Sequence, residues 1–247
     1  GESGSGKTTI GRAILGLAPV SAGTVTFRGE DISHPTKQRR RELTRDIQVV
    51  YQDPYSSLNP SLTIGDSLTE PMIVRKTPKH EARERVRELL DMVRLPADAA
   101  DRMPREFSGG QRQRVAIARA LALDPTLIIC DEPVSALDVS IQAQIINLML
   151  DLQEERGLAY MFVTHDLSVV KYISDDIMVM YLGQMVEKAP ADELFSNTLH
   201  PYTKALLSAI PVPSIHNKTK RILLHGEITS PVNPKPGCRF MARCPHA

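Results

Sequence analysis

The feature that most constrains this chain is its first eight residues, which read Gly-Glu-Ser-Gly-Ser-Gly-Lys-Thr. They match the phosphate-binding pattern G-x-x-x-x-G-K-[ST], in which glycines let backbone N–H groups wrap around a triphosphate. In such a loop Lys7 reaches the β- and γ-phosphates, and the Thr8 hydroxyl can bind Mg²⁺. The loop normally joins a buried strand to a helix, so it predicts an α/β fold that binds a nucleotide.

Apolar residues after the loop recur with helical spacing, at Ile10, Ala13, Ile14 and Leu17. No strand pattern precedes the loop, and we therefore expect the chain to be a fragment of a longer protein.

Composition narrows the class of protein. The chain has 247 residues, of which 42% are hydrophobic and 24% charged, enough for one large α/β domain or a core with a smaller appendage. Its apolar runs are far shorter than the roughly 20 residues that span a bilayer. A net charge of +1 provides no general attraction to nucleic acid, and three cysteines fit a reducing compartment. We expect a cytoplasmic location.

Strand and helix patterns alternate along much of the chain. The glycine-bounded segment 23–29 predicts a strand of a small antiparallel sheet. Apolar segments typical of buried strands lie at 47–51, 126–130, 159–163 and 177–181, with helical patterns at 140–156 and from Asp166 between the last three. The alternation predicts a parallel sheet with right-handed crossovers.

A helical insertion and a tail complete the organisation. Residues 79–93 carry one apolar stripe, formed by Ala82, Val86, Leu89, Leu90 and Val93. Another helix is expected at 111–123, and the chain becomes proline-rich beyond Pro190. The predicted division is a nucleotide-binding core at 1–52 and 116–190, a helical subdomain at 53–115 and a tail at 191–247.

Two carboxylates end a buried strand. Residues 127–132 read Leu-Ile-Ile-Cys-Asp-Glu, which places Asp131 and Glu132 at the carboxyl edge of a sheet, where α/β folds bind ligands. Asp131 is suited to hold Mg²⁺ through its water shell, and Glu132 to polarise the water that attacks the γ-phosphate. Taken alone, the pair is equally compatible with two solvated turn residues.

Two further polar residues follow strands. His165 comes two residues after segment 159–163 and could reach a γ-phosphate, although a lone histidine there is more often structural. Gln52 comes just after segment 47–51 and could offer its amide oxygen to Mg²⁺ or to the attacking water. By itself that signal is weak.

A second anion-binding arrangement lies at Ser108-Gly109-Gly110-Gln111, where a Ser-Gly-Gly turn opens a helix. The plain alternative is an ordinary helix N-cap. The chain has two such helix ends but one phosphate-loop lysine and one Asp-Glu strand end. Either the second end is idle, or it serves a nucleotide held mainly by another molecule, which implies a dimer with shared sites.

With these motifs in this order, the chain resembles the nucleotide-binding subunit of an ATP-binding cassette (ABC) transporter. The resemblance implies a P-loop NTPase fold, an α/β class with a RecA-like parallel sheet core, a small antiparallel β subdomain, an inserted helical subdomain and a C-terminal tail. It implies ATP binding by Gly1, Glu2, Ser3, Gly4, Ser5, Gly6, Lys7, Thr8 and Thr9, and Mg²⁺ binding by Thr8, Gln52 and Asp131. Catalytic roles fall on Lys7, Gln52, Glu132 and His165.

The same resemblance makes Ser108, Gly109, Gly110 and Gln111 the signature that contacts the partner's ATP, and Asp138 part of the D-loop. The signature opens with Phe107 where Leu is commoner, a change that we expect to be harmless. In the family, two subunits pack head to tail, with each ATP between one phosphate-binding loop, called Walker A and here residues 1–8, and the partner's signature.

Residues 51–60, 132–140, 200–203, 237–240 and 243–245 are similar to oligopeptide and dipeptide importers. In that group the tail can hold an iron-sulfur cluster, but Cys238 and Cys244 supply too few thiolates for one. We expect them to be loop cysteines in this fragment, and Cys130 to be a core residue.

The resemblance implies an ATP-hydrolysing subunit that works with a second ATP-binding subunit, identical or paralogous, two membrane permeases and, indirectly, a solute-binding protein. It would act without nucleic acid, as a peripheral protein on the cytoplasmic face of the plasma (inner) membrane. An importer of glutathione, nickel or another small solute could share these motifs, so the sequence does not identify the cargo.

A different class, the soluble ABC ATPases that act on DNA or ribosomes, carries a long coiled-coil insertion or a second cassette. The 55 residues between Gln52 and Ser108 show no sustained heptads, but a tandem cassette before residue 1 stays open. A catalytically dead structural subunit is disfavoured by the intact Lys7, Asp131, Glu132 and His165.

Overall fold

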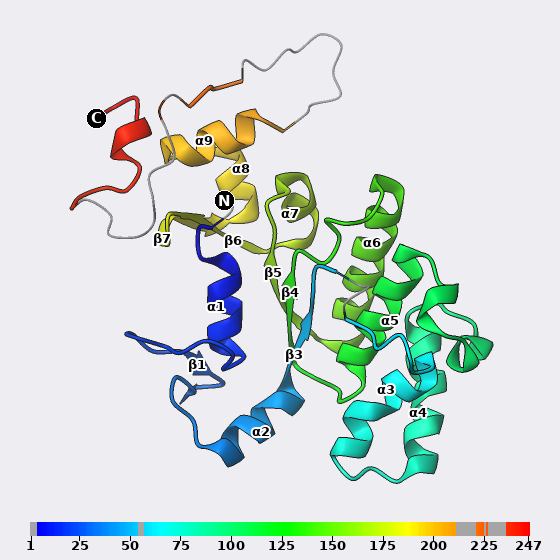
Figure 1. The fold of residues 1–247 in the computed structure, drawn as a ribbon. Coiled ribbons are helices and arrows are strands. Elements are labelled where there is room, and N and C mark those ends of the chain that lie inside the picture. Colours follow the sequence, from blue (N-terminus) through cyan, green and yellow to red (C-terminus); the bar gives the residue numbers. More distant parts are fainter. Residues whose placement is uncertain (1–3, 54–56, 211–220, 225, 227–235) are drawn as a thin grey trace. The chain divides into compact units, whose positions relative to one another are not determined.

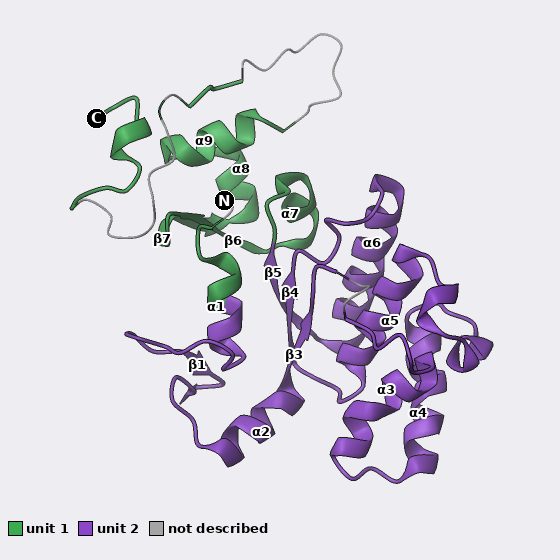
Figure 2. Cartoon of the chain, viewed as in Figure 1, with its two compact units in different colours: residues 1–10, 164–247 green, residues 11–163 purple. Residues whose placement is uncertain are grey.

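The computed structural model describes residues 4–53, 57–210, 221–224, 226 and 236–247. The chain forms two compact units, which Figure 2 distinguishes by colour. One contains residues 11–163, and the other contains residues 1–10 together with residues 164–247. Helix α1 (Lys7–Ile14) begins in the second of these and continues into the first.

A parallel sheet forms the core of the 11–163 unit. Its strands are β3 (Ile47–Val50), β4 (Leu127–Asp131) and β5 (Ala159–Val163), in the order β3-β4-β5 (Figure 1). The register pairs Ile47 with Leu127, and Leu127 with Ala159. All three strands were predicted from their apolar runs, and their parallel pairing is confirmed. Because they run in the same direction, their carboxyl ends meet at one edge.

A small antiparallel pair accompanies this sheet. Strands β1 (Thr26–Phe27) and β2 (Glu30–Asp31) are joined by Arg28 and Gly29, which both have positive φ, as a two-residue hairpin turn of type I′ requires. The predicted antiparallel sheet is thus confirmed. Helix α2 (Lys37–Asp46) follows, and its buried Leu43 packs in one cluster with Ile32, Ile47 and Ile129.

Helices make up the rest of this unit: α3 (Ile64–Val74), α4 (Lys79–Met92), α5 (Gly109–Leu121) and α6 (Val139–Arg156), with short helical turns η1 (Ala97–Asp101) and η2 (Pro104–Glu106). The predicted apolar stripe of α4 is buried along its whole length. Helix α6 ends where predicted, at Gly157, whose φ of 63° is the left-handed value that glycine adopts readily at a helix C-terminus.

The second unit contains α7 (Leu167–Ile173), β6 (Asp176–Tyr181), β7 (Gln184–Pro190), α8 (Ala191–Ser196), α9 (Pro201–Ser208) and a tail turn, η3 (Met241–Arg243). The strand predicted at 177–181 does form, as β6, but its partner is the antiparallel β7 that follows it. Leu182 and Gly183 explain this pairing, because both have positive φ and return the chain in a two-residue hairpin.

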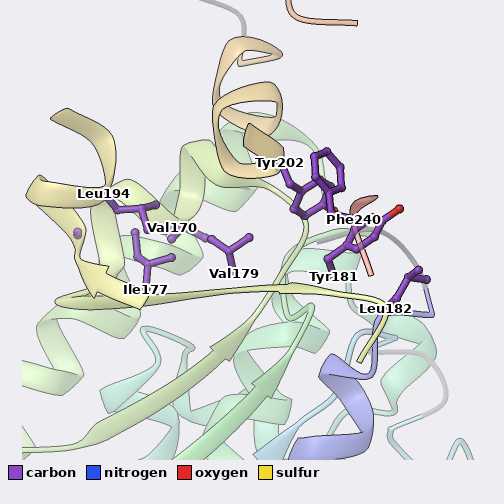
Figure 3. Close-up of a cluster of buried hydrophobic side chains, with 9 residues drawn as sticks. Val170, Ile177, Val179, Tyr181, Leu182, Leu194, Tyr202 and Phe240 are labelled. Atoms are coloured by element: carbon purple, nitrogen blue, oxygen red, sulfur yellow. The ribbon is translucent and has the colours of Figure 1, made fainter. Parts of the chain in front are cut away.

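The apolar core of this unit gathers residues from nearly all its elements (Figure 3). Its buried members are Val170, Ile177, Val179, Tyr181, Leu182, Ala191, Leu194, Tyr202 and Phe240. Since Phe240 belongs to the tail, the last described residues fold onto the β6–β7 hairpin and α9. Among the described helices, none has the length and hydropathy needed to cross a membrane.

Candidate nucleotide-binding site

The phosphate loop ends in the first turn of α1. Gly4 and Gly6 have φ values of 76° and 89°, a region that side-chain-bearing residues rarely adopt, so these two positions need glycine. The Gly6 carbonyl accepts a hydrogen bond from the Ile10 amide at 3.1 Å, which opens the helix. Gly1, Glu2 and Ser3, also predicted to bind the nucleotide, lie outside the described residues.

Ser5 is the buried, hydrogen-bonded residue of the described part of the loop. It is buried, with 2% of its surface exposed. Its hydroxyl accepts a hydrogen bond from the Lys7 ammonium at 3.1 Å, and its carbonyl accepts one from the Gly183 amide at 3.1 Å. Lys7 and Thr8 are half-buried, whereas Thr9 is exposed. Ser5 is therefore hydrogen-bonded both to Lys7, within the loop, and to Gly183, in the β6–β7 turn.

The carboxyl edge of the parallel sheet gathers three of the predicted residues in the other unit. Asp131 is the last residue of β4, where it pairs with Val163, and Glu132 follows it. Gln52 lies two residues beyond the end of β3, exposed at the same edge. Parallel pairing thus brings two oxygen-rich side chains and an amide to one edge, as the strand patterns predicted.

The backbone at Glu132 is held in an unusual conformation. Its φ is 51°, which an L-residue other than glycine seldom adopts. Its amide donates to the Val163 carbonyl at 2.8 Å, and its carbonyl accepts from the Ser135 amide at 3.2 Å and from the Ser135 hydroxyl at 3.1 Å. These bonds keep the strained backbone in place. In an extended strand, adjacent side chains point to opposite faces of the sheet. Because β4 ends at Asp131 and Glu132 has a left-handed backbone, the two adjacent carboxylates do not follow that alternation.

The signature residues form the N-terminus of α5. Ser108 is the N-cap, and its hydroxyl accepts from the Gln111 amide at 3.3 Å while the Gln111 side chain accepts from the Ser108 amide at 2.9 Å. The helical cap that the sequence offered as the plain alternative therefore exists. It does not exclude anion binding, because first-turn N–H groups other than the capped one have no partners within a helix.

Gly110 packs closely on the start of α6, and Gly109 lies beside Leu137, just before that helix. A Cβ built on Gly110 would lie 2.5 Å from Cγ2 of Ile141, and one built on Gly109 would lie 3.4 Å from Cδ2 of Leu137. Phe107, just before the cap, is 4% exposed and anchors the turn in the core. Asp138, predicted to belong to the D-loop, is the exposed N-cap residue of α6.

The predicted site residues are divided between the two units. The phosphate loop and His165 belong to one, and Gln52, Asp131, Glu132, Asp138 and the signature belong to the other. His165 comes two residues after the end of β5, as expected from its spacing.

The three cysteines differ in environment. Cys130 is fully buried in β4, as predicted, and burial raises the pKa of its thiol. Cys238 is exposed and Cys244 is partly buried. Within the described part of the chain, no group of three or more His, Cys, Asp or Glu side chains could hold a metal ion.

Sequence reasoning missed the contact between Ser5 and Gly183, and also Arg239, whose guanidinium donates to the Leu182 carbonyl. The sequence signal was Gly183, just after the strand pattern at 177–181, which marks a turn but not which residues the turn contacts. A groove between α4 and α6, lined in part by Glu88, Arg94 and Asp151, contains none of the predicted site residues.

Comparisons with known protein families match both ends of the chain. The family model described as ABC transporter matches residues 1–135, and the one described as oligopeptide/dipeptide transporter, C-terminal region, matches residues 186–247. The second match covers the tail from β7 onward.

Individual relatives match along the whole chain. The oligopeptide transport ATP-binding protein OppF of Salmonella typhimurium is 51% identical over 251 residues, which cover 100% of this chain and 75% of the relative. The dipeptide transport ATP-binding protein DppF of Escherichia coli is 49% identical over 245 residues, covering 99% and 73%.

Two solved structures share the fold. CbiO1 from Clostridium perfringens, part of the ABC transporter complex cbiONQ, has a TM-score of 0.73 and 29% identity, covering 80% of this chain and 77% of that one. The ATP-binding cassette MJ0796, a dimer bound to ADP and Pi, has a TM-score of 0.68 and 33% identity, covering 77% and 82%.

Proposed function

The chain belongs to the ABC transporter family, as an ATP-binding protein of the oligopeptide/dipeptide group, and from that membership we propose how its residues bind and hydrolyse ATP. It is the ATP-binding subunit of an oligopeptide or dipeptide importer, and its enzymatic activity is ATP hydrolysis. The residue roles below are our assignments.

Residues 1–9 hold the triphosphate of ATP. The support is the conformation of the described part of the loop, where two positive-φ glycines flank the buried Ser5 and Lys7 lies at the start of α1. Thr8, Gln52 and Asp131 supply hydroxyl, amide and carboxylate oxygens, the ligands that Mg²⁺ prefers. When bound, the metal neutralises negative charge on the phosphates.

Glu132 acts as the residue that orients and polarises the attacking water. The observation that carries this role is its pinned backbone, with φ of 51° and hydrogen bonds to Val163 and Ser135 on either side. The fixed backbone sets the direction in which the Glu132 side chain leaves the end of β4, and such positioning favours catalysis. His165 contacts the γ-phosphate.

A second ATP-binding subunit completes each site through residues 108–111, with Asp138 beside them in the D-loop. In support, Ser108 and Gln111 hold the first turn of α5 in a capping box whose remaining N–H groups suit an anion. The head-to-tail dimer docks on two permeases at the cytoplasmic face of the membrane, and a solute-binding protein delivers the peptide. The division into core, helical subdomain and tail stays a proposal, with Cys238 and Cys244 as loop cysteines.

The role of Glu132 is tested by Glu132→Gln in the full-length protein. Loss of the polarising carboxylate should lower ATP hydrolysis by about 10²- to 10⁴-fold, while ATP binding persists and traps the dimer. Glu155→Gln, the same change at an exposed position near the end of α6, is the matched control and should leave hydrolysis unchanged. Undiminished hydrolysis in Glu132→Gln would remove the role given to this residue.

A further inference from the structure

Phe240 is the aromatic side chain that packs the tail into the core of its unit. Phe240 is 1% exposed, and its ring lies 5.2 Å from that of Tyr181, edge on, and 5.5 Å from that of Tyr202 (Figure 3). The His200 ring lies 5.4 Å away. Arg243, at the end of the tail turn, reaches the Tyr181 hydroxyl at 3.5 Å. The described end of the tail thus packs against the end of β6 and the start of α9.

Phe240 packs beside Tyr181, the last residue of β6, and the residue before it in the tail, Arg239, lies next to the first residue of the following turn, Leu182. The Arg239 guanidinium donates a hydrogen bond to the Leu182 carbonyl, and its Nη1 lies 3.3 Å from where a Cβ on Gly183 would be. The Leu182 carbonyl and the Gly183 amide are the two ends of a single peptide group. That amide donates to the Ser5 carbonyl of the phosphate loop at 3.1 Å.

The peptide group between Leu182 and Gly183 therefore connects the tail to the phosphate loop. It is the central peptide of a two-residue hairpin turn, the group that reverses when such a turn changes type. Reversal would withdraw the N–H from Ser5. A cationic donor on the carbonyl opposes reversal, and it also polarises the peptide so that its N–H becomes a better donor.

We propose that Arg239 is a positioning residue for ATP binding, which holds the Leu182–Gly183 peptide in the orientation that supports Ser5 of the phosphate loop. Ser5 in turn accepts the hydrogen bond from Lys7. Through this peptide, the C-terminal tail of the chain determines how well the loop is preorganised for phosphates. The inference rests on the proposed ATP site at residues 1–9.

The test compares Arg239→Gln, Arg239→Lys and the unmodified full-length protein by titration with ATP. We expect about tenfold weaker ATP binding in Arg239→Gln, within the range usual for couplings between separate sites. Arg239→Lys keeps a cationic donor and should recover most of the affinity. Arg221→Gln removes an exposed arginine elsewhere in the tail and should bind ATP like the parent.

Hydrogen exchange supplies a readout that a general loosening of the fold would not reproduce. In Arg239→Gln the amides of residues 182–184 and of the phosphate loop should exchange faster, while those of β4 keep the parent rate. Equal ATP affinity in the parent and Arg239→Gln would overturn the proposal, as would an Arg239→Lys variant as weak as Arg239→Gln. If Arg239→Gln loses protection everywhere, Arg239→Lys decides.

Failure of the proposed function would look different. Lys7→Ala in the otherwise unmodified protein should abolish ATP binding. Equal ATP binding by the Lys7→Ala variant and the unmodified protein would refute the site itself. A site that depends on Lys7 but not on Arg239 would refute only the role of the tail.

Discussion

Gly110 provides the sharpest test of how the signature helix is held, because a single methyl group has no room there. A Cβ at this position would lie 2.5 Å from Cγ2 of Ile141, whereas ordinary contacts begin at 3.4 Å, so about 1 Å of space is missing. Ile141 lies in the first turn of α6, and a β-branched side chain in a helix has essentially one rotamer. The methyl group cannot be accommodated by rotating Ile141, and the two helices must separate.

We expect Gly110→Ala to destabilise the full-length protein by about 1–3 kcal/mol, the usual cost of overpacking, offset by up to about 1 kcal/mol for the better helix propensity of alanine. Gly109→Ala is the matched control, since its Cβ would meet the flexible end of Leu137 at 3.4 Å. Ile141→Ala makes room for the added methyl, so the double variant should be more stable than the sum of the single changes predicts.

Denaturant unfolding of the unmodified protein and the four variants measures these free energies, and ATP hydrolysis is followed in parallel. If separation of α5 from α6 also disturbs the signature, ATP hydrolysis should fall in Gly110→Ala and should be partly restored when Ile141→Ala is added. Equal stability of Gly109→Ala and Gly110→Ala, or strictly additive effects of the Gly110 and Ile141 changes, would refute the packing argument.

The remaining predictions concern titratable side chains. In the native protein at pH 8, iodoacetamide should modify the exposed Cys238 but not Cys130, because burial raises the pKa of the Cys130 thiol. Mass spectrometry of peptides measures the modification of both cysteines, with urea-unfolded protein as the control. Early modification of Cys130 in the native protein would contradict its burial in the core. Partial burial lowers the pKa of His200, against the opposing effect of Glu187, and its neutral Nδ1 caps α9 by accepting from the Tyr202 amide at 3.1 Å. The unfolded chain then binds the proton more readily, so this stabilisation is present above about pH 6.5 and is lost as the pH falls below that value. Between pH 7.5 and 5.5, thermal unfolding should show a smaller loss of stability in His200→Asn than in the unmodified protein. Equal losses of stability in the two proteins would argue against this role of His200.

Local patterns predicted much of the fold because each carried its own physical cause. The stripe of α4 repeats with the helical period and can be buried in only one way, and Gly157 ends α6 because it accepts left-handed φ. The apolar runs of β3, β4 and β5 predicted a parallel sheet, and the sheet placed Gln52, Asp131 and Glu132 at one edge. The pairing partner of β6 was harder to predict from the sequence, because the pairing depends on the turn at Leu182 and Gly183 rather than on the pattern of the strand itself.

The sequence by itself determined the chemistry of this protein: a phosphate loop, a strand that ends in two carboxylates, and a serine-glycine helix end, each read from residues adjacent in the chain. Only the tertiary structure decided how these motifs are supported. The peptide between Leu182 and Gly183 meets Ser5 on one side and Arg239 on the other, and Gly110 meets Ile141. Such contacts join residues far apart along the chain, and no local periodicity records them, because they depend on where folding brings each backbone group.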